Sequence, residues 1–94
     1  MEPAQGAAHV LVRGRVQGVG FRWFVRKTAN RLGIDGWVRN LPDGAVEAFV
    51  QGDDPALETM KEELSRGPRL ARVDDLVWNA RSQDSSCVSF VIRS

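Results

Sequence analysis

Residues 14–22, GRVQGVGFR, combine glycines with a terminal arginine in a pattern that is able to bind an anion. Glycine adopts left-handed backbone conformations at little cost, so this loop can turn successive backbone N–H groups toward one point. A predicted helix starts directly after the loop, and its first turn adds unpaired N–H donors and the positive end of the helix dipole. The segment therefore predicts a binding site for phosphate.

Arg22 is the charged side chain of this segment. A cation in the first turn of a helix opposes the helix dipole, and a bound anion would relieve that conflict. The planar guanidinium also matches two oxygens of a phosphate group. The alternative is a solvated surface arginine beside an ordinary tight turn, but the neighbouring glycines favour the anion site.

Asn40 is predicted to face the same site from another element. A helix over residues 22–32 climbs roughly 16 Å, and a strand over residues 36–41 returns roughly 20 Å, so the start of the helix and the end of the strand share one edge. The Asn40 amide can accept and donate hydrogen bonds without changing charge, which lets it hold a water in a fixed orientation. It is a poor general base.

This combination of groups favours one reaction class, the attack of water on a phosphate that already has a good leaving group. Such a transfer needs positioning and charge stabilisation more than proton transfer. An acyl phosphate fits, because it expels a carboxylate whose conjugate acid has a pKa of roughly 4. A phosphate monoester is harder to hydrolyse, and no clustered histidines, cysteines or paired carboxylates lie near the loop.

The elements that position these residues follow from apolar periodicity and from turn residues. The predicted order is strand 9–16, helix 22–32, a hairpin of strands 36–41 and 45–51, a helix from Asp54 to Gly67, and strands 73–80 and 88–93. Two helices on one face of an antiparallel sheet would bury both of their apolar stripes. We therefore predict an α+β fold, a ferredoxin-like α/β sandwich of βαββαβ order with an additional terminal strand.

The 94 residues are enough for one small domain. We expect it to span residues 8–94, after a flexible leader over residues 1–7 that contains Pro3 and Gly6. The net charge of +1 gives no general attraction for nucleic acid or anionic membrane, and no apolar run approaches the roughly 20 residues that span a bilayer. Cys87 is the single cysteine, so the simplest expectation is a cytoplasmic protein without a disulfide or a cysteine-based metal site. Nothing demands more than a monomer.

Residues 14–22 resemble the phosphate-loop signature of the acylphosphatase family. GWVRN at residues 36–40, followed by DG at 43–44 and VE at 46–47, resembles its second signature, and the similarity extends from about His9 to Arg93. The resemblance implies a free-standing enzyme of ferredoxin-like fold that hydrolyses small acyl phosphates to carboxylate and inorganic phosphate. It implies direct attack of water, with no metal, cofactor or covalent intermediate.

The resemblance also assigns roles by position. It implies that Arg22 binds the phosphate and that Asn40 orients the attacking water. It implies that the phosphate loop is formed by the backbone amides of Gln17, Gly18, Val19, Gly20 and Phe21. Inorganic phosphate is then expected to compete with substrate. Many family members end in tyrosine where this chain has Ser94, and we expect that difference to affect stability or tail packing instead of catalysis.

Two other function classes share features of this sequence. RNA-recognition modules share this architecture, and residues 18–24 superficially resemble their aromatic motif. In those modules the aromatic residues lie on a central strand, whereas Phe21 and Phe24 here belong to the inner stripe of a helix. The second class is a regulatory domain that binds anions with little turnover, because a fold does not establish activity.

Overall fold

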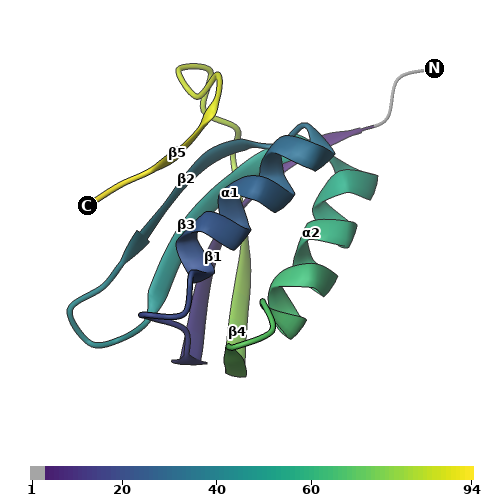
Figure 1. Cartoon of the computed structure of the whole chain (residues 1–94). Helices are drawn as coiled ribbons and strands as arrows, with labels where there is room; N and C mark the ends of the chain where they lie inside the picture. The colour runs from purple at the N-terminus through teal and green to yellow at the C-terminus, as the bar shows by residue number, and fades with distance from the viewer. Residues whose placement is uncertain (1–3) are drawn as a thin grey trace.

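The computed structural model describes residues 4–94, which form a five-stranded sheet with two helices (Figure 1). The elements are β1 (Gln5–Arg15), α1 (Phe21–Leu32), β2 (Asp35–Asn40), β3 (Val46–Asp53), α2 (Asp54–Arg66), β4 (Arg72–Arg81) and β5 (Phe90–Ile92). Both helices lie on one face of the sheet. Neither helix has the length and hydropathy needed to cross a membrane.

The sheet has the strand order β4-β1-β3-β2-β5. The first four of these strands pair antiparallel, as predicted, but β5 runs parallel to β2, so the prediction of an antiparallel sheet is wrong at this edge. The cause is the connection after β4. It crosses one end of the sheet, so that Phe90 enters beside Gly36 at the start of β2 and runs in the same direction.

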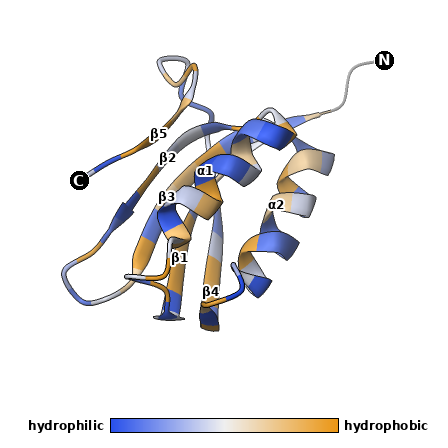
Figure 2. Cartoon of the chain, in the orientation of Figure 1, coloured by the Kyte–Doolittle hydropathy of each residue, from blue (hydrophilic) through white to orange (hydrophobic). Residues whose placement is uncertain are grey.

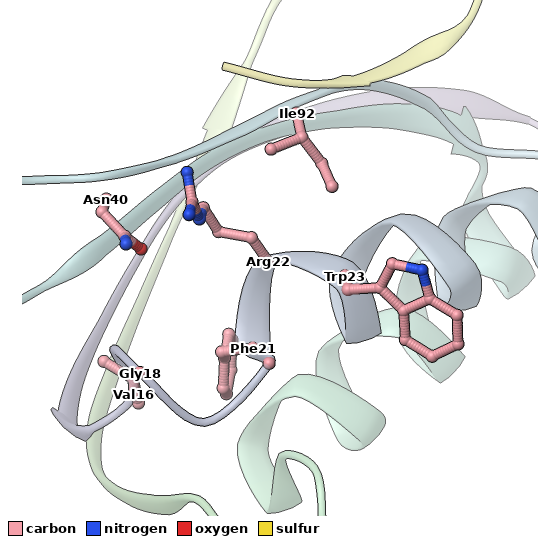
Figure 3. Close-up of a pocket in the computed structure, with 8 residues that line it drawn as sticks. Val16, Gly18, Phe21, Arg22, Trp23, Asn40 and Ile92 are labelled. Atoms are coloured by element: carbon pink, nitrogen blue, oxygen red, sulfur yellow. The ribbon is translucent and has the colours of Figure 1, made fainter. Parts of the chain in front are cut away.

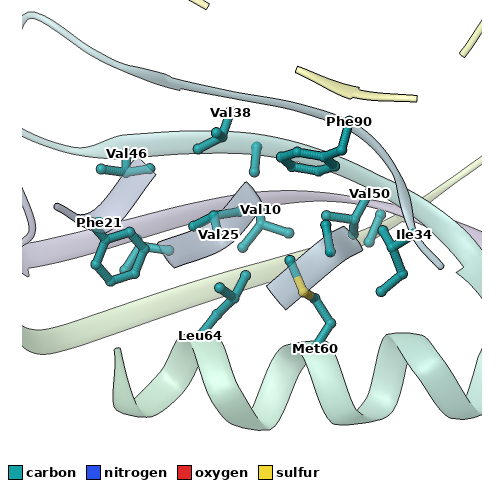
Figure 4. Packing of buried hydrophobic residues seen from close by; sticks show 14 of the residues in the cluster. Val10, Phe21, Val25, Ile34, Val38, Val46, Val50, Met60, Leu64 and Phe90 are labelled. Atoms are coloured by element: carbon teal, nitrogen blue, oxygen red, sulfur yellow. The ribbon is translucent and has the colours of Figure 1, made fainter. Parts of the chain in front are cut away.

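The hydrophobic core lies between the helices and the sheet (Figure 4). Within β1, Ala8, Val10 and Val12 are buried in alternation, while α1 and α2 present their apolar stripes to the sheet. Figure 2 shows hydrophobic and hydrophilic residues alternating along both helices. The largest fully buried side chains of the helices are Phe21, Val25, Met60 and Leu64. Burying one such side chain contributes roughly 1.5–3 kcal/mol, so this layer holds the start of α1 firmly on the sheet.

The N-terminal part of β1 was predicted to be a flexible leader. Instead β1 begins at Gln5, and residues 5–7 pair with residues 51–53 of β3, so the leader prediction is wrong for these three positions. Glycine and small residues favour coil locally, but β3 continues to Asp53 and offers an unpaired edge that the chain occupies. Residues 1–3 of the predicted leader lie outside the described part of the chain.

Glu47 lies on the face of the sheet opposite the helices, next to His9 and Arg39. Its carboxylate accepts hydrogen bonds from His9 Nε2, at 2.8 Å, and from Arg39 Nε. Burial would raise the pKa of Glu47, but the hydrogen bonds from His9 and Arg39 outweigh that effect and hold the pKa below its ordinary value. The ionised form is therefore the one that stabilises the fold.

A Glu47→Gln variant is expected to lower the free energy of unfolding by about 1 kcal/mol at neutral pH. Because the pKa of Glu47 is lower in the folded state, its stabilising contribution is present above the ordinary value of 4.5 and is lost as the pH falls through the folded value. Urea unfolding of the wild type and of Glu47→Gln at about pH 7 and about pH 3 tests this pH dependence. If the two proteins differed in free energy of unfolding by the same amount at both pH values, the stabilising role of ionised Glu47 would be contradicted.

Candidate active site

The loop between β1 and α1 has the left-handed backbone that its glycines predicted. Gly18 has φ 73° and Gly20 has φ 76°. A Cβ at either position would meet no atom within 4 Å, so backbone conformation, and not space, is what requires glycine here. Gly20 is the N-cap residue of α1. No side chain caps the start of this helix, and its first turn contains no acidic residue. The start of α1 therefore keeps its attraction for an anion.

A cavity of about 210 Å³ opens at this helix start (Figure 3). Its lining residues come from the loop, α1, β2 and β5: Val16, Gly18, Gly20, Phe21, Arg22, Trp23, Asn40 and Ile92. Arg22 and Asn40 extend into the same space, as the sequence geometry predicted. Gln17 and Val19 are not among the lining residues: Val19 packs against the core, and the Gln17 side chain bonds to the turn between β2 and β3.

Arg22 is half-buried in this cavity. Its Nη1 donates a hydrogen bond to the Arg93 carbonyl, with 3.3 Å between the atoms. None of the ion pairs found in residues 4–94 includes Arg22. The guanidinium charge thus stands beside the uncapped end of α1 without a carboxylate to balance it, and an anion that enters the cavity would meet both.

Asn40 is the last residue of β2 and pairs with Val46 of β3. Its Oδ1 is buried and has no hydrogen-bond partner in the structure. A buried polar atom without a partner costs roughly 1–3 kcal/mol, which is a cost that a ligand or water donating to Oδ1 would remove. Asn40, which carries this orphan acceptor, lines the same cavity as Arg22.

Several contributors to the site, Val16 among them, were not assigned from the sequence. Ile92 lines the cavity because β5 lies parallel to β2 and sets Ile92 opposite Val38. The Arg93 carbonyl holds Arg22, and Trp23 forms part of the rim while its indole projects away from Asn40. The hydropathy of the sequence could not place Ile92 or the Arg93 carbonyl at the site, because their positions depend on which strand β5 joins.

Among residues 4–94, no group of three or more histidine, cysteine or acidic side chains is arranged to hold a metal ion. The donors available to a ligand in this cavity are therefore backbone amides, one guanidinium and one carboxamide. Groups of this kind are suited to binding a phosphate and to orienting a water.

Comparison with known proteins identifies the family. The acylphosphatase family model matches residues 8–92. The chain belongs to the acylphosphatase family. An acylphosphatase from Thermococcus kodakarensis is 54% identical over 66 residues, covering 70% of this chain and 72% of the relative. An acylphosphatase from Koribacter versatilis is 48% identical over 82 residues, covering 87% of this chain and 74% of the relative.

Solved structures agree with this acylphosphatase assignment. The crystal structure of acylphosphatase from Bacillus subtilis superposes with a TM-score of 0.91 at 34% identity, over 95% of this chain and 99% of that one. The predicted family and the ferredoxin-like α+β fold are thus confirmed. The predicted function and enzyme class are confirmed with them, because acylphosphatases are hydrolases of acyl phosphates.

Proposed function

We propose that this acylphosphatase hydrolyses small acyl phosphates by direct attack of water on phosphorus, with Arg22 and Asn40 as its catalytic residues. The observation that supports this most strongly is the orphan Oδ1 of Asn40, because Asn40 lines the same cavity as the unpaired charge of Arg22. One group is suited to hold a water and the other to hold a phosphate. The uncapped start of α1 adds backbone donors beside them.

In the proposed reaction, the phosphoryl oxygens bind the Arg22 guanidinium and the backbone N–H groups of residues 17–21. Asn40 Oδ1 accepts a hydrogen bond from the water, whose oxygen then forms a bond to phosphorus. The bond between phosphorus and the acyl oxygen breaks, and the carboxylate leaves with the electron pair. Protons of the water remain on the product phosphate or pass to solvent, so no acid, base or covalent intermediate is needed.

The partners follow from the same proposal. The loop and Arg22 would bind the phosphate that all acyl phosphates share, so inorganic phosphate is both product and competitor. We infer that the chain acts as a monomer, because the proposed reaction needs no group from a second chain. A cytoplasmic location fits the single cysteine, Cys87. No part of the proposed chemistry calls for nucleic acid or a membrane.

The protein is expected to hydrolyse benzoyl phosphate in the presence of EDTA, and inorganic phosphate should raise KM without changing kcat. Phenyl phosphate, a monoester, is the control substrate and should turn over far more slowly. In ¹⁸O-labelled water the label should enter phosphate, because water attacks phosphorus. No hydrolysis above background would overturn the proposed activity, and label in benzoate would overturn the proposed point of attack.

A further inference from the structure

The side chain of Gln17 makes two hydrogen bonds that the proposed reaction does not use. Its Nε2 donates to the carbonyls of Leu41, at 2.8 Å, and of Ala45, at 2.9 Å. Both amide hydrogens of this partly buried side chain are thereby used, and both acceptors belong to the turn between β2 and β3. Gln17 therefore spans from the phosphate loop to a different segment of the chain.

The turn that receives these bonds is itself tightly closed. Leu41 N donates to Ala45 O at 2.8 Å, and Gly44 N donates to Leu41 O at 3.2 Å. The Gln17 amide bonds to the two carbonyls that flank the mouth of this turn. Because Leu41 follows Asn40 directly, the bond to Leu41 O fixes the backbone on the C-terminal side of Asn40.

The backbone pairing between β1 and β3 does not extend to the phosphate loop or to the β2–β3 turn. The ladder between β1 and β3 ends at the pair Val12 and Val46, before the phosphate loop and the turn begin. Beyond that pair, side chains link the two segments. One link is Gln17 and the other is the ion pair between Arg13 Nη1 and Asp43 Oδ2, at 2.9 Å, in which both side chains are about half exposed.

We propose that Gln17 is a positioning residue. Its amide ties the phosphate loop to the β2–β3 turn and thereby fixes the position of Asn40 relative to Arg22. This inference rests on the proposed roles of Asn40 and Arg22. A bound water must sit between the carboxamide and the phosphorus, and a displacement of about 1 Å in such a site can cost about 100-fold in rate. Two short hydrogen bonds to neighbouring carbonyls restrict that displacement in two directions.

The test compares Gln17→Met, which keeps the length of the side chain and removes its donors, with Arg13→Ala, which removes the exposed link to the same turn. With benzoyl phosphate, Gln17→Met is expected to lower kcat about 10-fold to 100-fold. Arg13→Ala is expected to stay within about 2-fold, because exposed ion pairs contribute little. Equal kcat values for Gln17→Met and the wild type would overturn the proposal.

A double-mutant comparison separates positioning from a general loss of stability. If Gln17 acts by aligning Asn40, then Gln17→Met should cost little further activity in an Asn40→Ala background. A full additional loss there would show that Gln17 supports the fold and does not act through Asn40. Urea unfolding of every variant establishes that each is folded under assay conditions.

A third variant gives a readout in the pH profile. In Gln17→Glu, a carboxylate would face two carbonyls with no proton to donate, whereas the protonated acid can donate to one of them. Its kcat relative to the wild type should therefore rise as the pH falls. A ratio that does not change with pH would contradict the requirement for a donor at this position.

NMR of the Asn40 side-chain amide tests the positioning role of Gln17 without relying on enzymatic activity. Its two N–H signals, assigned by their loss in Asn40→Ala, should shift or broaden in Gln17→Met and stay in place in Arg13→Ala. Unchanged signals in Gln17→Met would overturn the positioning role, whatever the assay shows. An inactive wild type would instead overturn the proposed function, while the NMR comparison would still decide the role of Gln17.

Discussion

Arg22→Ala is expected to lower kcat/KM for benzoyl phosphate by about 1,000-fold or more. Among residues 4–94, Arg22 is the one cation that lines the cavity, and phosphoryl transfer depends on such charge stabilisation. Affinity for inorganic phosphate should fall as well, since the guanidinium is proposed to contact the phosphoryl oxygens before and after the reaction. Steady-state kinetics and phosphate inhibition measure the two effects.

Two variants sharpen the Arg22 result. Arg22→Lys retains the charge but not the planar fork of donors, so it should recover only part of the lost activity. Arg26→Ala removes an exposed arginine of the same helix that does not line the cavity, and it should behave as the wild type does. A loss below about 10-fold in Arg22→Ala would mean that the backbone amides alone carry the phosphate site.

Asn40→Ala is expected to lower kcat by about 100-fold to 1,000-fold while leaving the inhibition constant of phosphate nearly unchanged. Arg22 and the loop amides would still hold the phosphate, but the water would lose its hydrogen-bond acceptor. The variant should not lower the free energy of unfolding greatly, because it deletes a buried oxygen that has no partner in the folded chain.

The Asn40 prediction is checked by measuring kcat, phosphate inhibition and urea unfolding on one preparation. If the variant lost phosphate binding but retained turnover of bound substrate, the water-orienting role would be wrong and Asn40 would belong to the phosphate site. A large drop in stability would indicate instead that the side chain supports the end of β2.

The convergence of Arg22 and Asn40 could be predicted from the sequence because it depends on local geometry. The rise of a helix and of a strand, with one turn between them, decides where the two residues lie. The left-handed glycines of the loop could be expected for the same reason, since backbone sterics act on each residue separately. The roles of Arg22 and Asn40, indicated by the chemistry of their side chains and implied again by the family resemblance, stay predictions until the variants are assayed.

The features that could not be predicted depend on pairing between distant segments. Residues 5–7 have the composition of coil and form a strand only because the end of β3 is available to them. The direction of β5 follows from the path of the connection across the sheet, which no periodicity encodes. Gln17 appeared in the sequence only as a backbone donor, because its side chain reaches the carbonyls of Leu41 and Ala45, which lie 24 and 28 positions away at the inner ends of the two predicted hairpin strands.

The hydrogen bond from Arg22 to the Arg93 carbonyl joins residues 71 positions apart through the shortest strand of the sheet. Edge segments with few backbone bonds open at a lower free energy than the core of a domain. If β5 detached from β2, Arg22 would lose its anchor, the cavity would lose Ile92 and the core would lose Phe90. We therefore expect the population of the competent site to follow the opening of β5.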